Sequence, residues 1–222
     1  MDEFRHEYKF PVNEWDCALL RRRLPLVMQR DEHSGGCYRI RSLYFDDPYD
    51  KALYEKLDGV AQREKFRIRL YNGNGNFIRL EKKIKRNGLC AKAMAPVSRQ
   101  ECESLIKGDY EVLRSREDAL VQEFYRKLTQ ELLRPKTLVD YQREAFVYPA
   151  GNVRITLDTD IRTGVSATDL FEPGLALVKA EEGRLLEVKF DEFLPEHIRA
   201  AMALRSRRSG EFSKYAACRR FL

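Results

Sequence analysis

The sequence has 222 residues, which suits one domain with a sizeable core. Its five cysteines include no CxxC pair, so neither a disulfide framework nor a cysteine-rich metal site is expected. No apolar run of about 18 residues is present, and we therefore expect a cytoplasmic protein without a transmembrane segment. The formal net charge of +6 permits an anionic partner but does not select one.

The pattern of apolar and polar residues predicts a chain that mixes strands and helices. Alternation with a period of two predicts strands at residues 4–10, 37–45, 65–71, 78–85, 89–97, 137–148, 152–161 and 184–190. Helical spacing and start signals predict helices at residues 14–24, 48–57, 98–107, 115–133 and 195–205. We expect Asn13 to cap the first helix, and Ser98 with Glu101 to form a capping box at the third. Residues 162–183 should form a loop with some strand, and residues 209–222 a basic final segment.

The most unusual stretch is a basic hairpin predicted at residues 65–92. It carries nine Lys or Arg residues and one acid, Glu81, so its charge is +8 while that of the whole chain is +6. The basic residues alternate with apolar residues on both predicted strands, and residues 72–76 supply a Gly/Asn turn. One face of this hairpin is therefore expected to be apolar and the other cationic.

Two interpretations of the cationic face remain open. Charged faces of strands are most often solvated surfaces over a core. An ordinary exposed face mixes both signs of charge, however, because like charges that lie opposite each other destabilise a sheet. The excess of one sign favours a phosphate-binding wall, in which Arg acts as a planar two-pronged donor and Lys as a mobile point charge. Nucleic acid is not favoured as a partner, because Phe66 and Phe77 fall opposite the cationic rows or at their edges.

The predicted strands can form two kinds of sheet. In both, charged faces recur on one side and apolar faces on the other, where the helices would pack. An open sheet would leave the charges in water, whereas a closed barrel would place them inside and remove the sheet edges. A barrel with charges inside needs a wet interior that holds a charged ligand. Periodicity alone does not separate these two folds.

Charged residues on the predicted strands and the final segment form the candidate set for such a site. They are Glu7, Lys9, Arg39, Arg41, Lys65, Arg67, Arg69, Arg79, Glu81, Lys83, Lys85, Lys92, Arg143, Glu144, Arg154, Asp158, Glu187, Lys189 and Lys214. A wall that only binds anions needs no acids, whereas phosphoryl transfer uses carboxylates to hold the divalent cation that bridges phosphate oxygens. For any single acid a salt bridge is the simpler explanation, so the argument depends on several acids together.

Motifs of other chemistries are missing. The sequence contains no GxSxG, HExxH, GxxxxGK[ST] or GxGxxG pattern. Gly73 and Gly75 lie in NGNGN, which is typical of a hairpin turn and is not a P-loop because no GK[ST] follows. His6 falls on the apolar face of the first strand, where a role in the core is expected rather than one in catalysis.

Eight short blocks follow one another along nearly the whole chain. They are RHEYKF (5–10), YRIRSLYFDD (38–47), KFRIRLY (65–71), LEKKIKRNGLCAK (80–92), YQREAF (141–146), VRITLDTDI (153–161), LLEVKF (185–190) and FSKY (212–215). In this order they resemble the VTC domain, the polyphosphate-polymerase domain of the vacuolar transporter chaperone complex. That domain belongs to the triphosphate tunnel metalloenzyme (CYTH-like) superfamily.

The resemblance implies an α+β fold, in which an eight-stranded antiparallel β-barrel tunnel has a cationic lumen and helices packed outside. Residues 1–222 would form a single VTC-like triphosphate tunnel domain. Family members transfer the γ-phosphate of ATP to a growing polyphosphate chain with Mn²⁺ or Mg²⁺, and relatives hydrolyse triphosphates. The implied partners are ATP and polyphosphate or tripolyphosphate, and a membrane protein that takes up the product is compatible with them.

The resemblance also implies roles for particular residues. Those implied to act in catalysis are Lys9, Arg67, Arg69, Lys83 and Glu187. Those implied to bind phosphates are Lys9, Arg67, Arg69, Lys83, Lys92, Arg143, Arg154 and Lys214. Glu187 would be the metal carboxylate, with Glu7 as a second candidate. The N-terminal ExExK motif of the superfamily is altered, because Arg5 stands at its first position. The VTC branch departs from that motif as well, so the change favours a polymerase over a hydrolase and leaves the role of Glu7 open.

Four functions are compatible with these residues. The first is a metal-dependent phosphotransferase of the polyphosphate-polymerase type. The second is a triphosphatase or nucleotidase on the same tunnel, and the third is a polyphosphate-binding module without turnover. The fourth is a nucleic-acid-binding sheet, whose affinity would fall steeply with salt.

Overall fold

The computed structural model describes residues 4–31, 36–180, 183–205 and 207–220. Within these ranges an antiparallel sheet contains eight strands along one continuous hydrogen-bonded path. In spatial order they are β1 (His6–Val12), β10 (Arg184–Phe190), β8 (Val153–Thr163), β7 (Arg134–Tyr148), β3 (Cys37–Asp46), β4 (Gln62–Tyr71), β5 (Ile78–Arg86) and β6 (Leu89–Pro96). Two short strands, β2 (Gln29–Arg30) and β9 (Val178–Lys179), pair with β7 and β8. All eight predicted strands are present, and the α+β class is confirmed.

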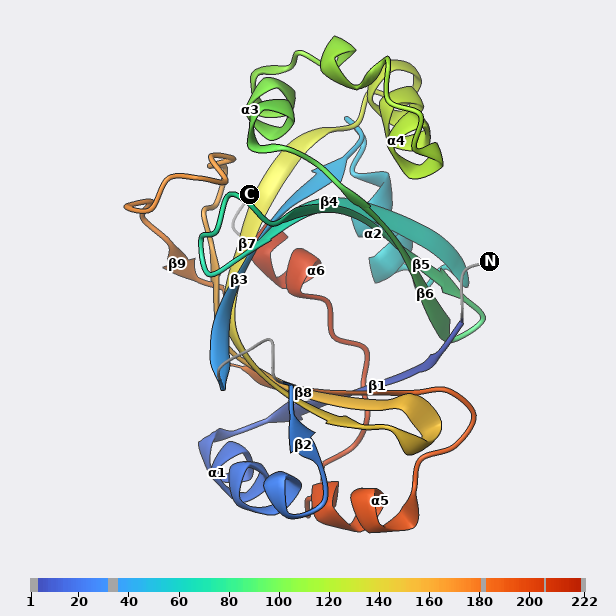
Figure 1. The fold of residues 1–222 in the computed structure, drawn as a ribbon, viewed down its shortest axis with the longest axis vertical. Coiled ribbons are helices and arrows are strands. Elements are labelled where there is room, and N and C mark those ends of the chain that lie inside the picture. The colour runs from blue at the N-terminus through green and yellow to red at the C-terminus, as the bar shows by residue number, and fades with distance from the viewer. Residues whose placement is uncertain (1–3, 32–35, 181–182, 206, 221–222) are drawn as a thin grey trace.

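The sheet curves so that its first and last strands, β1 and β6, come together (Figure 1). Arg5 and Cys90 form a bridge there. The amide of Arg5 donates to the carbonyl of Cys90 over 2.9 Å, and the amide of Cys90 donates back over 3.0 Å. In the described ranges this bridge is the one backbone pairing between the two ends of the path. One face of the curved sheet is therefore directed inward and the other outward.

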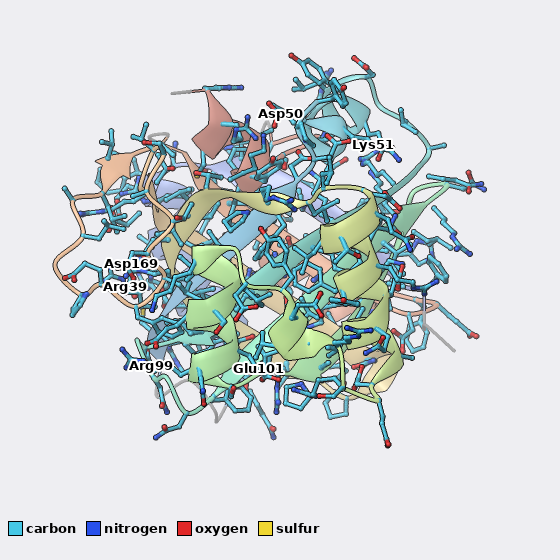
Figure 2. The ribbon with its side chains drawn as sticks, turned by 90° about the horizontal axis from the view of Figure 1, so that it is seen from above. Arg39, Asp50, Lys51, Arg99, Glu101 and Asp169 are labelled. Carbon is cyan, nitrogen blue, oxygen red and sulfur yellow. The ribbon has the colours of Figure 1, made fainter. Side chains whose placement is uncertain are left out.

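Helices pack mainly on the outer face. They are α1 (Glu14–Arg23), α2 (Lys51–Leu57), α3 (Arg99–Lys107), α4 (Ala119–Gln130), α5 (Glu196–Met202) and α6 (Lys214–Arg219), with 3₁₀ turns at Leu24–Leu26, Glu111–Leu113 and Ala150–Asn152. Leu20 of α1 and Ile198 of α5 are buried with Ile155 and Val188 of the sheet. Figure 1 shows α3 and α4 on the opposite side of the molecule, and in Figure 2 they lie over the sheet. No helix in the part of the chain that the structure describes is long and apolar enough to cross a membrane.

Aromatic packing holds α4 against the outer face of the basic hairpin. Phe124 of α4 is fully buried and lies edge-on to Phe45 and stacked on Phe66, with ring centroids 4.9 and 5.2 Å apart. Phe66 therefore belongs to the outer apolar face, as the alternation within residues 65–71 predicts. The side chains that alternate with it are directed to the inner face, because neighbouring residues of a strand point to opposite sides.

Two helix starts match their predicted caps, and three helices are clearly shorter than expected, including the one expected at residues 195–205, which spans Glu196–Met202. Asn13 forms a capping box with Asp16, and Ser98 forms one with Glu101. The helix expected at residues 115–133 begins only at Ala119, because the Asp118 side chain accepts hydrogen bonds from the backbone of the first turn. The helix expected at residues 48–57 similarly begins at Lys51, after a residue with left-handed backbone angles.

The last helix differs from the expected arrangement, because α6 lies on the inner side of the curved sheet (Figure 1). Tyr215 of α6 is fully buried, stacks on Tyr44 of β3 at 5.0 Å between ring centroids, and donates to Asp46 over 2.6 Å. The expectation that helices pack outside is thus wrong for α6. Its aromatic residue finds a better apolar environment among the tyrosines of the inner face than on the surface.

Candidate functional site

A cavity of about 620 Å³ lies on the inner face of the sheet. All eight main strands contribute lining residues, together with α2, α6 and the segment that precedes α6. Among the described residues, fourteen Lys or Arg side chains and three Glu side chains line it. Like charges at such density repel one another, so this cavity is suited to a ligand with several negative charges.

The ten site residues implied by the sequence all line this cavity. They are Glu7, Lys9, Arg67, Arg69, Lys83, Lys92, Arg143, Arg154, Glu187 and Lys214. They come from strands that are far apart in the sequence but adjacent in the sheet. The structure therefore brings the whole set together, while the role of each residue remains a proposal.

Lys65, Lys85 and Lys189 of the wider charged set also line the cavity, whereas other members of that set lie elsewhere. Arg39 and Arg41 were expected among the inward charges, but both bind Asp140, with Nε–Oδ distances of 2.8 and 2.9 Å, and neither lines the cavity. The reason is the register of β3, which directs the tyrosines of this strand inward and its arginines outward. Figure 2 shows Arg39 at the periphery of the molecule.

The inward residues of β4 and β5 form a wall in which arginines are fixed by one acid. Glu81 is fully buried, and its Oε2 lies 2.6 Å from Nη2 of Arg67 and 3.5 Å from Nη1 of Arg69. Arg67 also donates to the hydroxyl of Tyr44 over 2.7 Å, and Arg69 to the hydroxyl of Tyr141 over 3.2 Å. Burial alone would raise the pKa of Glu81, but the two arginines hold it well below its usual range. Both guanidinium groups are therefore oriented before a ligand arrives.

Two lysines of the same region are less well compensated. The ammonium group of Lys65 lies over the Tyr215 ring at 5.0 Å and 3.5 Å from Oγ of Ser213, and no carboxylate is among its ion pairs in the described ranges. Burial, with repulsion from Lys83 and other cations, lowers the pKa of Lys65 to about 7. Burial likewise lowers the pKa of Lys92 to about 8, although Glu81 lies 3.4 Å away. A bound anion would stabilise both ammonium groups.

The facing wall, formed by β1 and β10, mixes acids with cations. Lys9 is paired with Glu187 in the strand register, and Glu7 with Lys189. Lys83 of β5 reaches across to Glu7, with Nζ 2.7 and 2.8 Å from its two oxygens. Burial acts to raise the pKa of both carboxyls, but the surrounding lysines hold each below its usual range. Both acids are therefore ionised at neutral pH.

A third ion-pair group joins β7, β8 and α6. Asp158 is fully buried and accepts from Arg143 over 2.6 and 2.7 Å, and Nζ of Lys214 lies 2.5 Å from its Oδ2. Arg154 lies nearer the surface, where it donates to the Tyr38 hydroxyl over 3.3 Å. The buried acid orients Arg143 and Lys214, two of the cations that the family resemblance implies for phosphate binding.

Glu7 and Glu187 are the carboxylates that could hold a divalent cation. Both contact the same ammonium group, since Nζ of Lys9 lies 3.3 Å from Glu7 and 3.8 Å from Glu187. In the described ranges no group of three His, Cys, Asp or Glu side chains has the arrangement of a metal site. Mg²⁺ is commonly held by one or two carboxylates together with substrate phosphates and water. The pair fits a hard cation that binds jointly with a phosphate ligand.

The cavity offers no activated thiol for covalent catalysis among its described lining residues. Cys90 is the cysteine that lines it, and its Sγ lies 3.4 Å from Oε2 of Glu7. Burial raises the pKa of the Cys90 thiol, and the thiolate is the nucleophilic form. Arg5, at the altered position of the N-terminal motif, binds Asp191 over 2.6 Å and so serves an ion pair there.

The family of the chain follows from comparison with known proteins. Residues 4–222 match the VTC domain. The chain belongs to the VTC domain family. No curated protein matches its sequence.

Solved structures share the fold of this VTC domain at low sequence identity. HpAC1 from Hippeastrum, a proposed adenylyl cyclase described as having a dominant triphosphatase activity, is 15% identical, with a TM-score of 0.57. The match covers 97% of this chain and 95% of that one. A proposed adenylate cyclase from Bacillus halodurans is 14% identical over 90% of this chain and 86% of its own, with a TM-score of 0.52. The resemblance to triphosphate tunnel proteins is thus confirmed at the level of the fold.

Several lining residues of the VTC domain were not expected from the sequence. Tyr44 and Tyr141 orient the two arginines, and the alternation of β3 could have indicated the first of them. Lys56 lies on a helix and Arg63 precedes the strand expected at residues 65–71, so strand alternation did not include them. Glu211 lies in a segment without regular structure, and no pattern in the sequence marks it.

Proposed function

We propose that this VTC domain is a metal-dependent phosphotransferase of the polyphosphate-polymerase type, which moves the γ-phosphate of ATP onto a polyphosphate chain. We also propose that residues 1–222 form one domain whose eight strands close into a tunnel, with the bridge between Arg5 and Cys90 as the closing contact. The supporting observation is the surplus of cations in the inner cavity. ATP and polyphosphate are polyanions that would offset this surplus.

The proposed catalysis depends on positioning and on charge. Arg67, Arg69, Lys83 and Lys214 would bind the phosphate oxygens and neutralise their repulsion. The terminal oxygen of a polyphosphate chain attacks the γ-phosphorus in line, a new P–O bond forms, and the bond to ADP breaks with its electron pair leaving on ADP. Mg²⁺ or Mn²⁺ held by Glu187, with Glu7 beside it, would supply further neutralisation of the transferring group.

A second candidate function is a triphosphatase in the same cavity. It is favoured by the triphosphatase activity described for HpAC1, which shares the fold. The same cations would bind the triphosphate, and water in place of a polyphosphate end would attack the γ-phosphorus. The two functions differ only in which acceptor reaches that atom.

Incubation of the protein with ATP and Mn²⁺ tests the proposal. Long polyphosphate on a gel, with equimolar release of ADP and loss of the product when the metal is chelated, is the expected result. Free phosphate without chains would select the triphosphatase. Unchanged ATP together with tight polyphosphate binding would select a binding module without turnover, and would overturn both enzymatic assignments.

A further inference from the structure

The segment at residues 209–213, which leads into α6, lines the cavity together with the sheet. Its backbone is tied to β1, because the amide of Gly210 donates to the carbonyl of Lys9 over 2.8 Å and Nζ of Lys9 donates to the carbonyl of Phe212 over 3.1 Å. Ser213 lies next to the ammonium group of Lys65. Figure 1 shows this part of the chain running through the space that the sheet encloses. Glu211 is therefore presented to the cavity from a fixed backbone.

Three cations from three elements meet at the Glu211 carboxylate. Lys85 of β5 lies 2.8 Å from Oε1, Arg63 of β4 lies 3.5 Å from the same oxygen, and Lys56 of α2 binds Oε2. The hydrogen bonds from Lys56 and Lys85 lower the pKa of Glu211 to about 2, so the carboxylate is an anion throughout the neutral range. We name Lys56, Arg63 and Lys85 the outer cation cluster.

The outer cation cluster carries more charge than Glu211 compensates. Within the described ranges, each of its three members has Glu211 as its one carboxylate partner, which leaves a surplus of two positive charges. The side chain of Glu211 is 52% exposed, whereas that of Arg63 is 7% exposed. Glu211 can therefore turn toward water, while Arg63 is held in place. The cluster has the composition of an anion site that one side-chain carboxylate partly fills.

The cluster continues the row of cations on β4. Arg63, Lys65, Arg67 and Arg69 all line the cavity and are spaced by two residues, so the row spans about 20 Å at a strand rise of about 3.3 Å per residue. Three linked phosphates are too short to touch both ends of such a row. A longer linear polyphosphate can contact Arg67 and the outer cluster at the same time.

We propose that Lys56, Arg63 and Lys85 form a second phosphate subsite, which binds a distal unit of a linear polyphosphate after displacing Glu211. This inference rests on the proposed function, since it assigns the polyanion of that function a further contact. The subsite would make the protein prefer long polyphosphates, because a polyphosphate that reaches the outer cation cluster gains contacts that tripolyphosphate lacks. Glu211 then acts as a competitor that weakens the binding of long chains.

Binding measured by calorimetry at low ionic strength, with tripolyphosphate and with long-chain polyphosphate, tests the subsite. Glu211→Gln removes the competitor and should tighten long-chain binding about two- to fivefold, the scale of a partly exposed charge pair. The double variant Lys56→Ala/Lys85→Ala should weaken long-chain binding about fivefold or more. Both should change tripolyphosphate binding less than twofold, which also shows that the cavity is intact.

Glu103→Gln is the matched control, because Glu103 pairs with Arg99 on α3 and does not line the cavity. It should change neither affinity. Lys56→Ala alone, on the helix, is a milder variant in case the double variant fails to fold. Equal changes for both ligands, or no change for the long chain, would overturn the subsite. Failure of the unmodified protein to bind either polyanion would instead overturn the proposed function.

Discussion

Two walls of the same cavity use similar residues in different proportions. On the β4–β5 wall, cations outnumber the single acid Glu81, which is fully buried beneath them. On the β1–β10 wall, Glu7 and Glu187 lie among lysines in near-equal number, and Lys9 contacts both acids. Under the proposed function the first wall would bind phosphate by itself, whereas the second would also supply the carboxylate oxygens that hold a metal. Binding and turnover should therefore be separable by mutation.

The largest effect is expected at the acidic wall. Glu187→Gln keeps the size of the side chain but removes its charge, so turnover should fall about 10²–10³-fold, the range for losing a group that stabilises charge in the transition state. Tripolyphosphate binding should persist, because the neighbouring lysines lose their competitor. Steady-state kinetics measures the fall in turnover, and calorimetry measures tripolyphosphate binding. Glu144→Gln is the control, since Glu144 is a buried acid that pairs with Arg21 and does not line the cavity; simultaneous loss of fold and binding in Glu187→Gln would make Glu187 structural.

The cationic wall should respond in the opposite way. Arg67→Ala should weaken tripolyphosphate binding by about 1.5–3 kcal/mol, the scale of a charge-assisted hydrogen bond. Titration calorimetry measures this, and a thermal unfolding curve shows how much the loss of a partner for buried Glu81 destabilises the protein. Arg39→Ala, on the outer face, should leave binding unchanged. A near-neutral effect of Arg67→Ala would remove Arg67 from the binding wall.

The pH dependence of binding should report the two less well compensated lysines, Lys65 and Lys92. Burial lowers the pKa of Lys65 to about 7 and that of Lys92 to about 8, and bound phosphate favours the charged form of each. Above these values binding must take up protons, so affinity should fall as pH rises from about 7 to about 9, by up to tenfold per pH unit for each proton taken up. Calorimetry in buffers of different ionisation enthalpy counts the protons. Lys65→Arg should remove the loss of affinity that begins near pH 7. An affinity that does not depend on pH would contradict a role of these lysines in phosphate binding.

Lys65 should also make the stability of the ligand-free protein depend on pH, and stability should rise with pH where phosphate affinity falls. The pKa of Lys65 is lower in the folded protein than its ordinary value. Between the two values the unfolded chain binds more protons, so this group makes the protein more stable as pH rises through that window. Chemical unfolding of the ligand-free protein at pH 7 and pH 9, compared with Lys65→Met, measures that contribution.

The smallest effect is expected for the hydroxyl that orients an arginine. Tyr44→Phe removes the acceptor that Arg67 uses over 2.7 Å but leaves its pair with Glu81. Tripolyphosphate binding should weaken by about 0.5–1.5 kcal/mol, the net contribution of one hydrogen bond. Tyr54→Phe, at an exposed position on α2, is the control. An effect as large as that of Arg67→Ala would mean that the hydroxyl itself contacts the ligand.

The sequence predicted the basic hairpin well because its alternation is long and regular. On β4 and β5 the residues that line the cavity, such as Arg67 and Lys83, alternate with apolar residues, so their inward positions follow from period two. Lys82 departs from this pattern, because it lies on the outer face and pairs with Glu123 of α4. On β3 the same reasoning failed for Arg39 and Arg41, because each face of that strand mixes polar with apolar residues and either face could be directed inward. Only pairing with its neighbours decides which face is inner, and pairing is a property of the whole sheet.

Other parts of the site depend on contacts that no local pattern encodes. Glu211 reaches the cavity because α6 folds back inside the sheet, and the helical period of residues 214–219 does not say on which side it packs. The alternation of β8 predicts which face of the strand carries Asp158. It does not predict that Asp158 orients Lys214, because that contact joins two segments more than fifty residues apart in the sequence. Ion pairs between distant segments are therefore what the sequence could not supply.

The bridge between Arg5 and Cys90 has a mechanical consequence. Along most of the sheet neighbouring strands share long ladders, such as the seven residue pairs between β1 and β10, whereas two hydrogen bonds join β1 to β6. In the tunnel that we propose, the joint with the fewest hydrogen bonds lies between β1 and β6, so we expect the sheet to open between Arg5 and Cys90 when a bound polyphosphate widens the tunnel. Their amides should accordingly exchange with deuterium sooner than that of Ile68, which lies in the middle of a ladder.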